Sequence, residues 1–284
     1  MRKRHLVLLV FTMLGFAAAA NAQGDPKPPD PDSSDWGSWF RRVDKTQKEQ
    51  PHWITPLATT TPRLEEEYRY DILWQPRADG TTTMNYGGGK GLELIPFEKV
   101  EVILNQPAYV AHNNPRVPDG YGDFAALVKY RLLSSNEEQG SYILTAFLGV
   151  SATTGTNGNG ALRPILTPTI AYGKGIHNFD VQGTFGIAFP SSDTAVIGRT
   201  YAWNNAFQYR LYRKLWPEVE INSSFFQEGK NDGKKQVFVT PGLVIGRLHL
   251  WKRVGFTVGG GMQIATTHFH TSNHNGILSV RFPF

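Results

Sequence analysis

From about residue 64 onward, apolar and polar residues alternate along the chain with a period of two. In the first such run, Tyr68, Tyr70 and Ile72 alternate with Arg69 and Asp71. Successive side chains of a β-strand point to opposite faces, so each run predicts a strand with one apolar and one polar face. About twelve such runs follow one another to the C-terminus, which predicts about twelve strands.

The connections between these runs also alternate in length. After even-numbered runs they are short, as at 96–98 and 174–177, whereas after odd-numbered runs most are longer and rich in turn formers, as at 107–122 and 153–160. Short turns at one end and long loops at the other are typical of transmembrane β-barrels. Pro168 and Pro241 lie inside two of the runs, where proline often accompanies a β-bulge.

Alternation alone would also fit a soluble β-sandwich. Three features favour a membrane barrel. Many runs reach ten residues, whereas strands of soluble proteins average five or six. Aromatic residues such as Trp74, Tyr172 and Trp203 stand near the ends of runs, as in interfacial girdles. Charges also occur in the middle of runs. We therefore predict an all-β protein, a transmembrane antiparallel β-barrel of about 12 strands with an N-terminal periplasmic or plug segment, in the bacterial outer membrane.

The last run, residues 273–284, ends in an aromatic residue. Leu278, Val280, Phe282 and Phe284 share one face of it. A chain that ends in this way resembles outer-membrane barrels, whose assembly machinery recognises a terminal strand ending in Phe. The expected partners are therefore outer-membrane lipid and the barrel-assembly machinery.

Residues 1–22 have the pattern of a secretory signal peptide: a basic start, an apolar run from Leu6 to Ala20 and an A-x-A site that ends at Ala22. The alternative, a membrane-anchoring helix, would need about 20 apolar residues. Removing the signal takes away three basic residues and lowers the formal net charge from +5 to +2. A net charge of +2 does not indicate a nucleic-acid partner. The chain has no Cys, so it forms no disulfide.

Residues 23–61 form a separate region ahead of the barrel, which we place at residues 62–284. The region begins with Pro and Asp residues, which are typical of an extended linker. Yet it contains Trp36, Trp39 and Trp53, and disordered tails are poor in aromatic residues. Two interpretations follow: a periplasmic tail with a few residues packed on the barrel rim, or a plug that folds into the lumen.

The run G-Y-G-D-F-A-A-L-V-K-Y-R-L at 120–132 carries a more particular likeness, together with the glycine-rich loop at 155–160 and the closing R-F-P-F. These features resemble a family of outer-membrane transporter-like proteins named for the meta-pathway of phenol degradation. The resemblance covers about residues 64–284. It implies an outer-membrane channel or transporter for small, hydrophobic or aromatic solutes.

The polar faces of the predicted strands place a set of charged side chains of both signs in the lumen, on a candidate solute path: Glu67, Arg69, Asp71, Glu93, Glu101, Lys129, Arg131, Asp180, Arg210, Glu218, Glu220 and Arg281. A pore that selects one ion sign carries rings of a single sign, so the mixture argues against strong ion selectivity. The charges form either a salt-bridged lumen that stabilises the barrel or a polar path for solute. A twelve-strand barrel is narrower than the 16–18-stranded porins, so side chains or residues 23–61 could fill its lumen.

Signals for metal binding and catalysis are weak. His268, His270 and His274 share one predicted loop, but no Cys or acid stands beside them, so we predict no metal and no cofactor. The common catalytic motifs are absent. An enzyme with its active site at the outer rim of the barrel would have to use residues whose spacing matches no catalytic motif. These are His112, Asp119, Ser191, Ser192 and Asp193. We therefore predict a non-enzymatic channel or transporter. The alternatives are an outer-membrane enzyme acting on lipid or peptide and a structural barrel with a closed lumen.

Overall fold

The computed structural model describes residues 35–77 and 79–284. The predicted signal peptide and the Pro/Asp-rich start of residues 23–61 lie outside the described residues. Residues 39–284 form one compact unit, and the first residues of helix α2 (Asp35–Lys48) belong to another.

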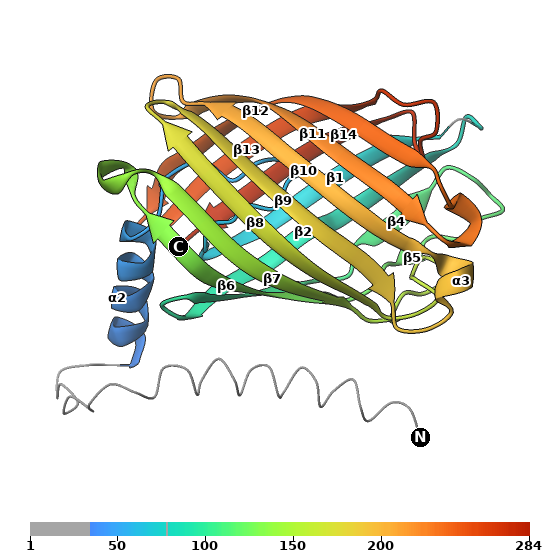
Figure 1. Cartoon of the computed structure of the whole chain (residues 1–284), viewed down its shortest axis with the longest axis horizontal. Coiled ribbons are helices and arrows are strands. Elements are labelled where there is room, and N and C mark those ends of the chain that lie inside the picture. Colours follow the sequence, from blue (N-terminus) through green and yellow to red (C-terminus); the bar gives the residue numbers. More distant parts are fainter. Residues whose placement is uncertain (1–34, 78) are drawn as a thin grey trace. The chain divides into compact units, whose positions relative to one another are not determined.

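The larger unit is built from antiparallel strands (Figure 1). The strands are β1 (Glu67–Pro76), β2 (Thr82–Phe97), β3 (Val100–Asn105), β4 (Tyr109–His112), β5 (Gly120–Tyr121), β6 (Ala125–Ser135), β7 (Tyr142–Ser151), β8 (Ile165–Ile176), β9 (Phe179–Pro190), β10 (Arg199–Tyr209), β11 (Leu215–Gln227), β12 (Lys235–Trp251), β13 (Val254–Ala265) and β14 (His274–Pro283). Short helices η1 (Glu137–Gln139), α3 (Thr194–Ile197) and η2 (Gly229–Asn231) lie in connections.

The sheet closes on itself because β1 pairs with both β14 and β2. Strands β3 and β4 both pair with β2 and are separated only by residues 106–108, so they form one wall strand; β5 leads into β6 in the same way. The wall therefore has 12 strands. This confirms the predicted all-β antiparallel barrel of about twelve strands. The first strand begins at Glu67, somewhat after the barrel start placed at residue 62.

The two faces of the wall differ as the alternation predicts. On β1, Arg69 is 2% exposed, whereas Trp74, on the opposite face, is 38% exposed. Large apolar side chains cover the outer surface on other strands too, for example Phe185, Trp203 and Leu278. No helix in the described part of the chain is long and apolar enough to cross a membrane.

The suggested bulges at Pro168 and Pro241 are wrong. The pairs Leu166↔Phe189 and Thr169↔Gly186 flank Pro168 without a change of register. The ladder between β12 and β13 likewise keeps its register across Pro241. Each proline removes one N–H donor from the ladder, and the neighbouring pairs hold the strands in place.

The loop expected at 107–122 contains β4 and β5, and the residues at its end organise a second loop. The Asp123 carboxylate accepts hydrogen bonds from the backbone N–H groups of Thr154, Gly155 and Ala161, at 2.9, 2.8 and 2.6 Å. A Cβ atom on Gly120 would lie 2.7 Å from Thr156 Oγ1, so the close approach of the loops requires glycine there. The G-Y-G-D run and the glycine-rich loop are thus one structural unit.

Helix α2 was not predicted from the sequence. Its residues Trp39 and Val43, four positions apart, lie on one face and pack against Leu64 and Ile95. The Trp39 indole N–H also donates to Glu66, at 2.7 Å.

The C-terminal carbonyls of α2 have no partners within the helix, and the barrel supplies them. Arg131 donates to the carbonyl of Thr46 at 2.7 Å, and the Asn136 amide donates to that of Lys48 at 3.2 Å. Barrel side chains therefore cap the end of the helix from which the chain continues into the lumen.

Candidate functional site: the occupied lumen

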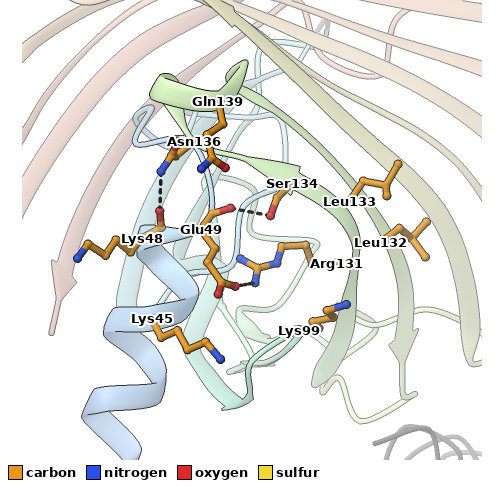
Figure 2. A pocket seen from close by; sticks show the side chains of 10 residues that line it. All are labelled: Lys45, Lys48, Glu49, Lys99, Arg131, Leu132, Leu133, Ser134, Asn136 and Gln139. Atoms are coloured by element: carbon orange, nitrogen blue, oxygen red, sulfur yellow. Dashed lines mark hydrogen bonds and ion pairs between the residues drawn. The ribbon is translucent and has the colours of Figure 1, made fainter.

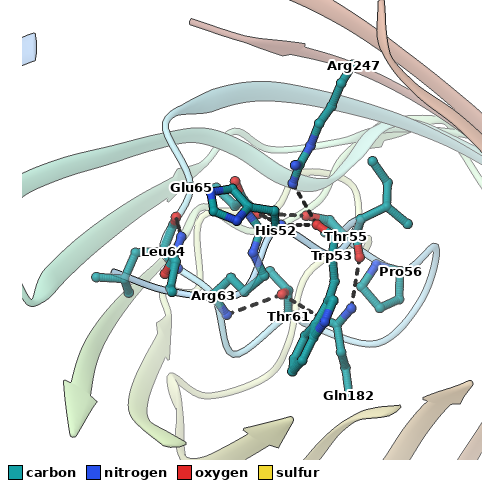
Figure 3. A network of polar contacts seen from close by, with 12 residues as sticks. His52, Trp53, Thr55, Pro56, Thr61, Arg63, Leu64, Glu65, Gln182 and Arg247 are labelled. Carbon is teal, nitrogen blue, oxygen red and sulfur yellow. Dashed lines mark hydrogen bonds and ion pairs between the residues drawn. The ribbon is translucent and has the colours of Figure 1, made fainter. Parts of the chain in front are cut away.

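Residues 50–66, here called the lumen segment, lie inside the barrel without forming helix or strand (Figure 3). The segment binds side chains of β1, β6, β9, β11 and β14, on all sides of the wall. A segment that reaches every side of a closed sheet must lie within it. Pro51, Pro56 and Pro62 cannot donate backbone hydrogen bonds and favour an extended chain, which explains the absence of secondary structure.

Buried backbone groups need hydrogen-bond partners, and a segment without secondary structure must find them elsewhere. Basic lumen side chains satisfy its carbonyls. Arg281 donates to the carbonyls of Thr55 and, at 2.9 Å, of Pro56. Arg69 donates to the carbonyl of Pro56 at 3.2 Å and to that of Leu57.

The same arrangement continues towards both ends of the lumen segment. Lys129 donates to the carbonyl of Arg63 at 3.0 Å. The carbonyl of Trp53 accepts from Arg247 at 2.6 Å and from Arg63 (Figure 3). These bonds to cationic donors are stronger than neutral ones.

Acidic lumen side chains satisfy the backbone N–H groups of the segment. Glu218 accepts from Leu57 at 3.0 Å. Glu220 accepts from Ala58 at 2.7 Å and from Thr59 at 2.5 Å. The acids of β11 thus hold the N–H side of the chain, and the bases of β1 and β14 hold the carbonyl side.

The amide side chain of Gln50 joins the two ends of the segment. It donates to the carbonyl of Leu64 at 2.7 Å and accepts from the N–H of Leu64 at 2.9 Å. Residues 50–64 therefore form a closed loop within the lumen, and Gln50 is fully buried.

Apolar side chains of the lumen segment fill space left by glycines of the wall. Leu57 packs in a cluster with Ile54, Trp216 and Val244. A Cβ atom on Gly242 would lie 2.5 Å from Leu57 Cδ1, and one on Gly259 would lie 2.8 Å from Leu57 Cδ2. Any other residue at these positions would compete with the lumen segment for space.

The predicted lumen residues are mostly where parity places them. All except Arg210 are at most 5% exposed. Arg210 follows the end of β10, is half-buried and donates to Asn178 at 3.2 Å in a short turn. Two ion pairs join members of the set: Arg69 to Asp71 at 2.8 Å and Lys129 to Glu101 at 2.9 Å. Asp180 accepts from Gln182 at 3.0 Å.

Several further residues contribute to the site but were not predicted. Gln182 donates to the carbonyl of Ile54 at 2.8 Å, and Thr145 donates to that of Pro62 at 2.6 Å. Gln182 lies on the polar face of β9 with Asp180 and Thr184, so parity could have found it if uncharged polar residues had been included, whereas Thr145 shares its face of β7 with Ile143 and Phe147 and had no such signal. Arg247 and Arg63 have no such signal. Arg247 lies where the β12–β13 ladder shifts register, and Arg63 lies outside the strands.

Open space is unequally distributed along the lumen. Beside Ile54 and Trp53, towards the short turns, two cavities measure about 20 and 10 Å³, and such volumes hold about one water molecule. A cavity of about 240 Å³ adjoins Leu57, Lys90 and Gln263. Another of about 480 Å³ lies among the long loops, beside Thr83 and His112. The smallest of these cavities therefore lie beside Trp53 and Ile54 of the lumen segment.

The three loop histidines are not brought together. The His274 ring packs edge-on against Trp74, with centroids 5.5 Å apart. His270 contacts the Thr267 carbonyl at 3.0 Å and Asn273 at 3.1 Å. The described residues contain no cluster of three or more side chains suited to a metal ion.

The candidate catalytic residues separate into two groups. Asp119 accepts from the backbone N–H of His112, whose ring contacts Asn159 at 2.6 Å and Thr83 at 3.3 Å. Elsewhere, Ser192 and Asp193 both accept from Arg163 Nε, at 3.1 and 2.6 Å. Neither group pairs a serine with a histidine in the hydrogen bond that nucleophilic catalysis needs.

The fold and the site define a closed β-barrel whose lumen is occupied by the chain's own N-terminal region. No family model matches the chain, and no curated protein matches its sequence. Among solved structures, the chain is similar to the crystal structure of an outer-membrane channel from Pseudomonas putida F1. The TM-score is 0.55 at 13% sequence identity, over 81% of this chain and 98% of that one. At this identity the likeness shows a shared barrel fold.

Proposed function

We propose that the protein is an outer-membrane channel for small solutes and that the lumen segment is its plug. The observation that carries the proposal is the binding of the backbone at 53–63 by side chains from opposite sides of the barrel. The likeness to a channel of known structure also supports this proposal.

The proposed solutes are small, and the channel discriminates weakly between ions of opposite sign. Acids and bases occur together in the lumen, and many are already bound to the lumen segment or to each other. A field of one sign is therefore not available to select ions. The preference for hydrophobic or aromatic solutes rests on the family resemblance of 120–132 and the closing strand.

The proposed location is the bacterial outer membrane, with the short turns in the periplasm. Exposed apolar side chains around the wall, such as Phe185 and Leu278, suit contact with lipid. Strand β14, with Phe282 and Phe284 at its end, is the proposed signal for the barrel-assembly machinery.

Single-channel conductance in a planar bilayer tests the proposal. The mature protein is compared with a form that lacks residues 23–61, after both are shown to be folded barrels by their heat-modifiable migration in gels. A channel with a plug conducts weakly when intact and more strongly when truncated. Equal conductance in both forms would keep the channel but remove the plug.

The alternative is a structural barrel with a closed lumen, which the many hydrogen bonds of the lumen segment also favour. Such a barrel would conduct in neither form. Silence of the truncated barrel, with its fold verified, would therefore contradict the channel proposal.

A further inference from the structure

A groove lies at the short-turn end of the barrel, beside the end of α2 and strand β6 (Figure 2). Its volume is about 550 Å³. Lys45, Lys48 and Glu49 line it from the helix and its end, Lys99 from the β2–β3 turn, and Arg131 from β6. Four of these five side chains are basic, so the groove attracts anions.

The structure leaves part of this positive charge available. Lys45 is paired with Glu98 at 2.7 Å and Arg131 with Glu49 at 2.9 Å. Lys48 and Lys99 are exposed, and neither ammonium group has a hydrogen bond or an ion pair in the described part of the chain. These two side chains can move their ammonium groups towards an anion at little cost, because each is a flexible four-carbon chain.

An apolar surface adjoins the basic residues. The pairing of β6 with β7 shifts register between Arg131 and Leu133, which marks a bulge. As a result two consecutive residues, Leu132 and Leu133, are 42% and 58% exposed, and in Figure 2 both point away from Arg131. Regular alternation would have turned one of them inward.

The groove also lies at the depth where lipid headgroups are expected. Tyr130, which pairs with Val100 beside the short β2–β3 turn, and Tyr142, the first residue of β7, are 37% and 42% exposed on the outer wall. Exposed tyrosines of this kind mark the boundary between hydrocarbon and headgroups. Lys99 lies just beyond this boundary, since its carbonyl accepts from the N–H of Arg131 at 2.8 Å.

From this geometry we propose that the groove binds the phosphate headgroup of an anionic phospholipid in the leaflet that faces the short turns. Lys99 binds the phosphate oxygens and an acyl chain lies along Leu132 and Leu133, while Lys48, on the other side of Glu49 and Arg131 in Figure 2, adds positive charge to the groove. This inference rests on the membrane placement given under the proposed function. Basic pockets at a membrane boundary recognise anionic headgroups in this way.

Binding at this position would also hold the start of the lumen segment. Arg131, Ser134 and Asn136 already donate to carbonyls at the end of α2, which leads directly into residues 50–66. A bound headgroup adds a further link between this helix end and the wall.

Native mass spectrometry of the full mature chain tests the site. The protein is purified in a mild detergent and mixed with phosphatidylglycerol or with phosphatidylcholine, and retained lipid is counted at each concentration. A variant with Lys48→Gln and Lys99→Gln is expected to bind phosphatidylglycerol about tenfold more weakly. The matched control, Lys214→Gln with Lys252→Gln, changes two exposed lysines of other short turns and is expected to bind like the unchanged protein.

Two further arms separate a lipid from free phosphate, which has the same oxygen chemistry. Replacing Leu132 and Leu133 by Ser should weaken phosphatidylglycerol binding and leave the binding of inorganic phosphate unchanged. Equal losses in both lysine pairs would show general attraction to a basic surface and overturn the site. Tight binding of inorganic phosphate with no preference for phosphatidylglycerol would overturn its assignment to lipid. Conductance enters none of these readouts, so the site can fail while the channel proposal stands.

Discussion

The Glu220 carboxylate of β11 accepts a hydrogen bond from the backbone N–H of Ala58 at 2.7 Å, across 162 positions of sequence. Its second oxygen accepts from the N–H of Thr59 at 2.5 Å. One buried side chain therefore holds two consecutive peptide groups of the lumen segment against the wall.

Replacing this acid should loosen the segment. Glu220→Gln keeps one acceptor oxygen but turns an N–H2 group towards a backbone N–H. Losing a hydrogen bond to a charged group costs about 1.5–3 kcal/mol, so open events in single-channel recordings should become about tenfold more frequent. The control is Glu93→Gln, since Glu93 is also a fully buried acid of the lumen but has no hydrogen bond to the lumen segment in the described part of the chain. Equal effects of both changes would contradict the role of Glu220.

A larger residue at Gly242 should displace the lumen segment by steric overlap. The nearest atom to a Cβ placed there is Leu57 Cδ1, at 2.5 Å, and the next is Glu218 Cγ at 3.3 Å. Gly242→Val is expected to raise conductance. It is also expected to lower the free energy of unfolding by about 1–3 kcal/mol. In Gly260→Val the new Cβ meets its nearest atom, the Ile277 carbonyl oxygen, at 3.5 Å, so this control should leave conductance unchanged.

The outer face of β6 can be tested with a single charge. Val128 shares its face with Tyr130, which is exposed on the outer wall, and Ala125 shares its face with the buried Lys129. Val128→Lys should lower the free energy of unfolding in lipid by roughly 2–4 kcal/mol. Ala125→Lys should cost less, because the lumen is polar. Denaturant titration in lipid vesicles measures both values, and equal losses would overturn the assignment of the two faces.

Acid should break the contact between His52, in the lumen segment, and Glu137, in the β6–β7 turn. Burial alone would raise the pKa of Glu137, but the ring and the backbone N–H of His52, which contact its carboxylate at 2.8 and 2.6 Å, lower the pKa to about 2. A carboxyl group whose pKa is lower when folded stabilises the folded state above its unfolded pKa of 4.5 and loses that effect as the pH falls towards 2. Thermal melts should therefore show the protein losing more stability than Glu137→Gln between these pH values. Parallel curves would contradict this contribution.

The alternation along the strands predicts the wall of the barrel well. A side chain's face depends only on the strand period, and so Arg69, Lys129 and Glu218 could be placed in the lumen from the sequence. What these charges bind could not be predicted in the same way. Neither a salt-bridged lumen nor a polar path for solute includes what Arg281 and Glu220 do, since their hydrogen bonds go to the backbone of the lumen segment.

The lumen segment itself left only weak signals. Pro51, Pro56 and Pro62 indicate an extended chain, which fits a tail outside the barrel as well as a plug. The feature that holds residues 50–66 inside the barrel is the fit of Trp53 and Leu57 over wall glycines far along the chain. Such a fit depends on the closed barrel, so no local pattern could reveal it.

A reversible disulfide between the lumen segment and the wall can show whether the segment moves during conduction. The chain has no cysteine of its own, so a pair introduced as Leu57→Cys and Gly242→Cys is the one disulfide possible. The Leu57 side chain is the nearest neighbour of a Cβ atom placed on Gly242, so the two introduced side chains face each other. If the segment must leave the wall for solute to pass, the oxidised protein should stay closed and regain conductance when a reductant is added. Each single-cysteine variant should be insensitive to the reductant. Equal conductance in the oxidised and reduced double variant, with the disulfide verified by mass spectrometry, would mean that solute passes beside a segment that stays bound.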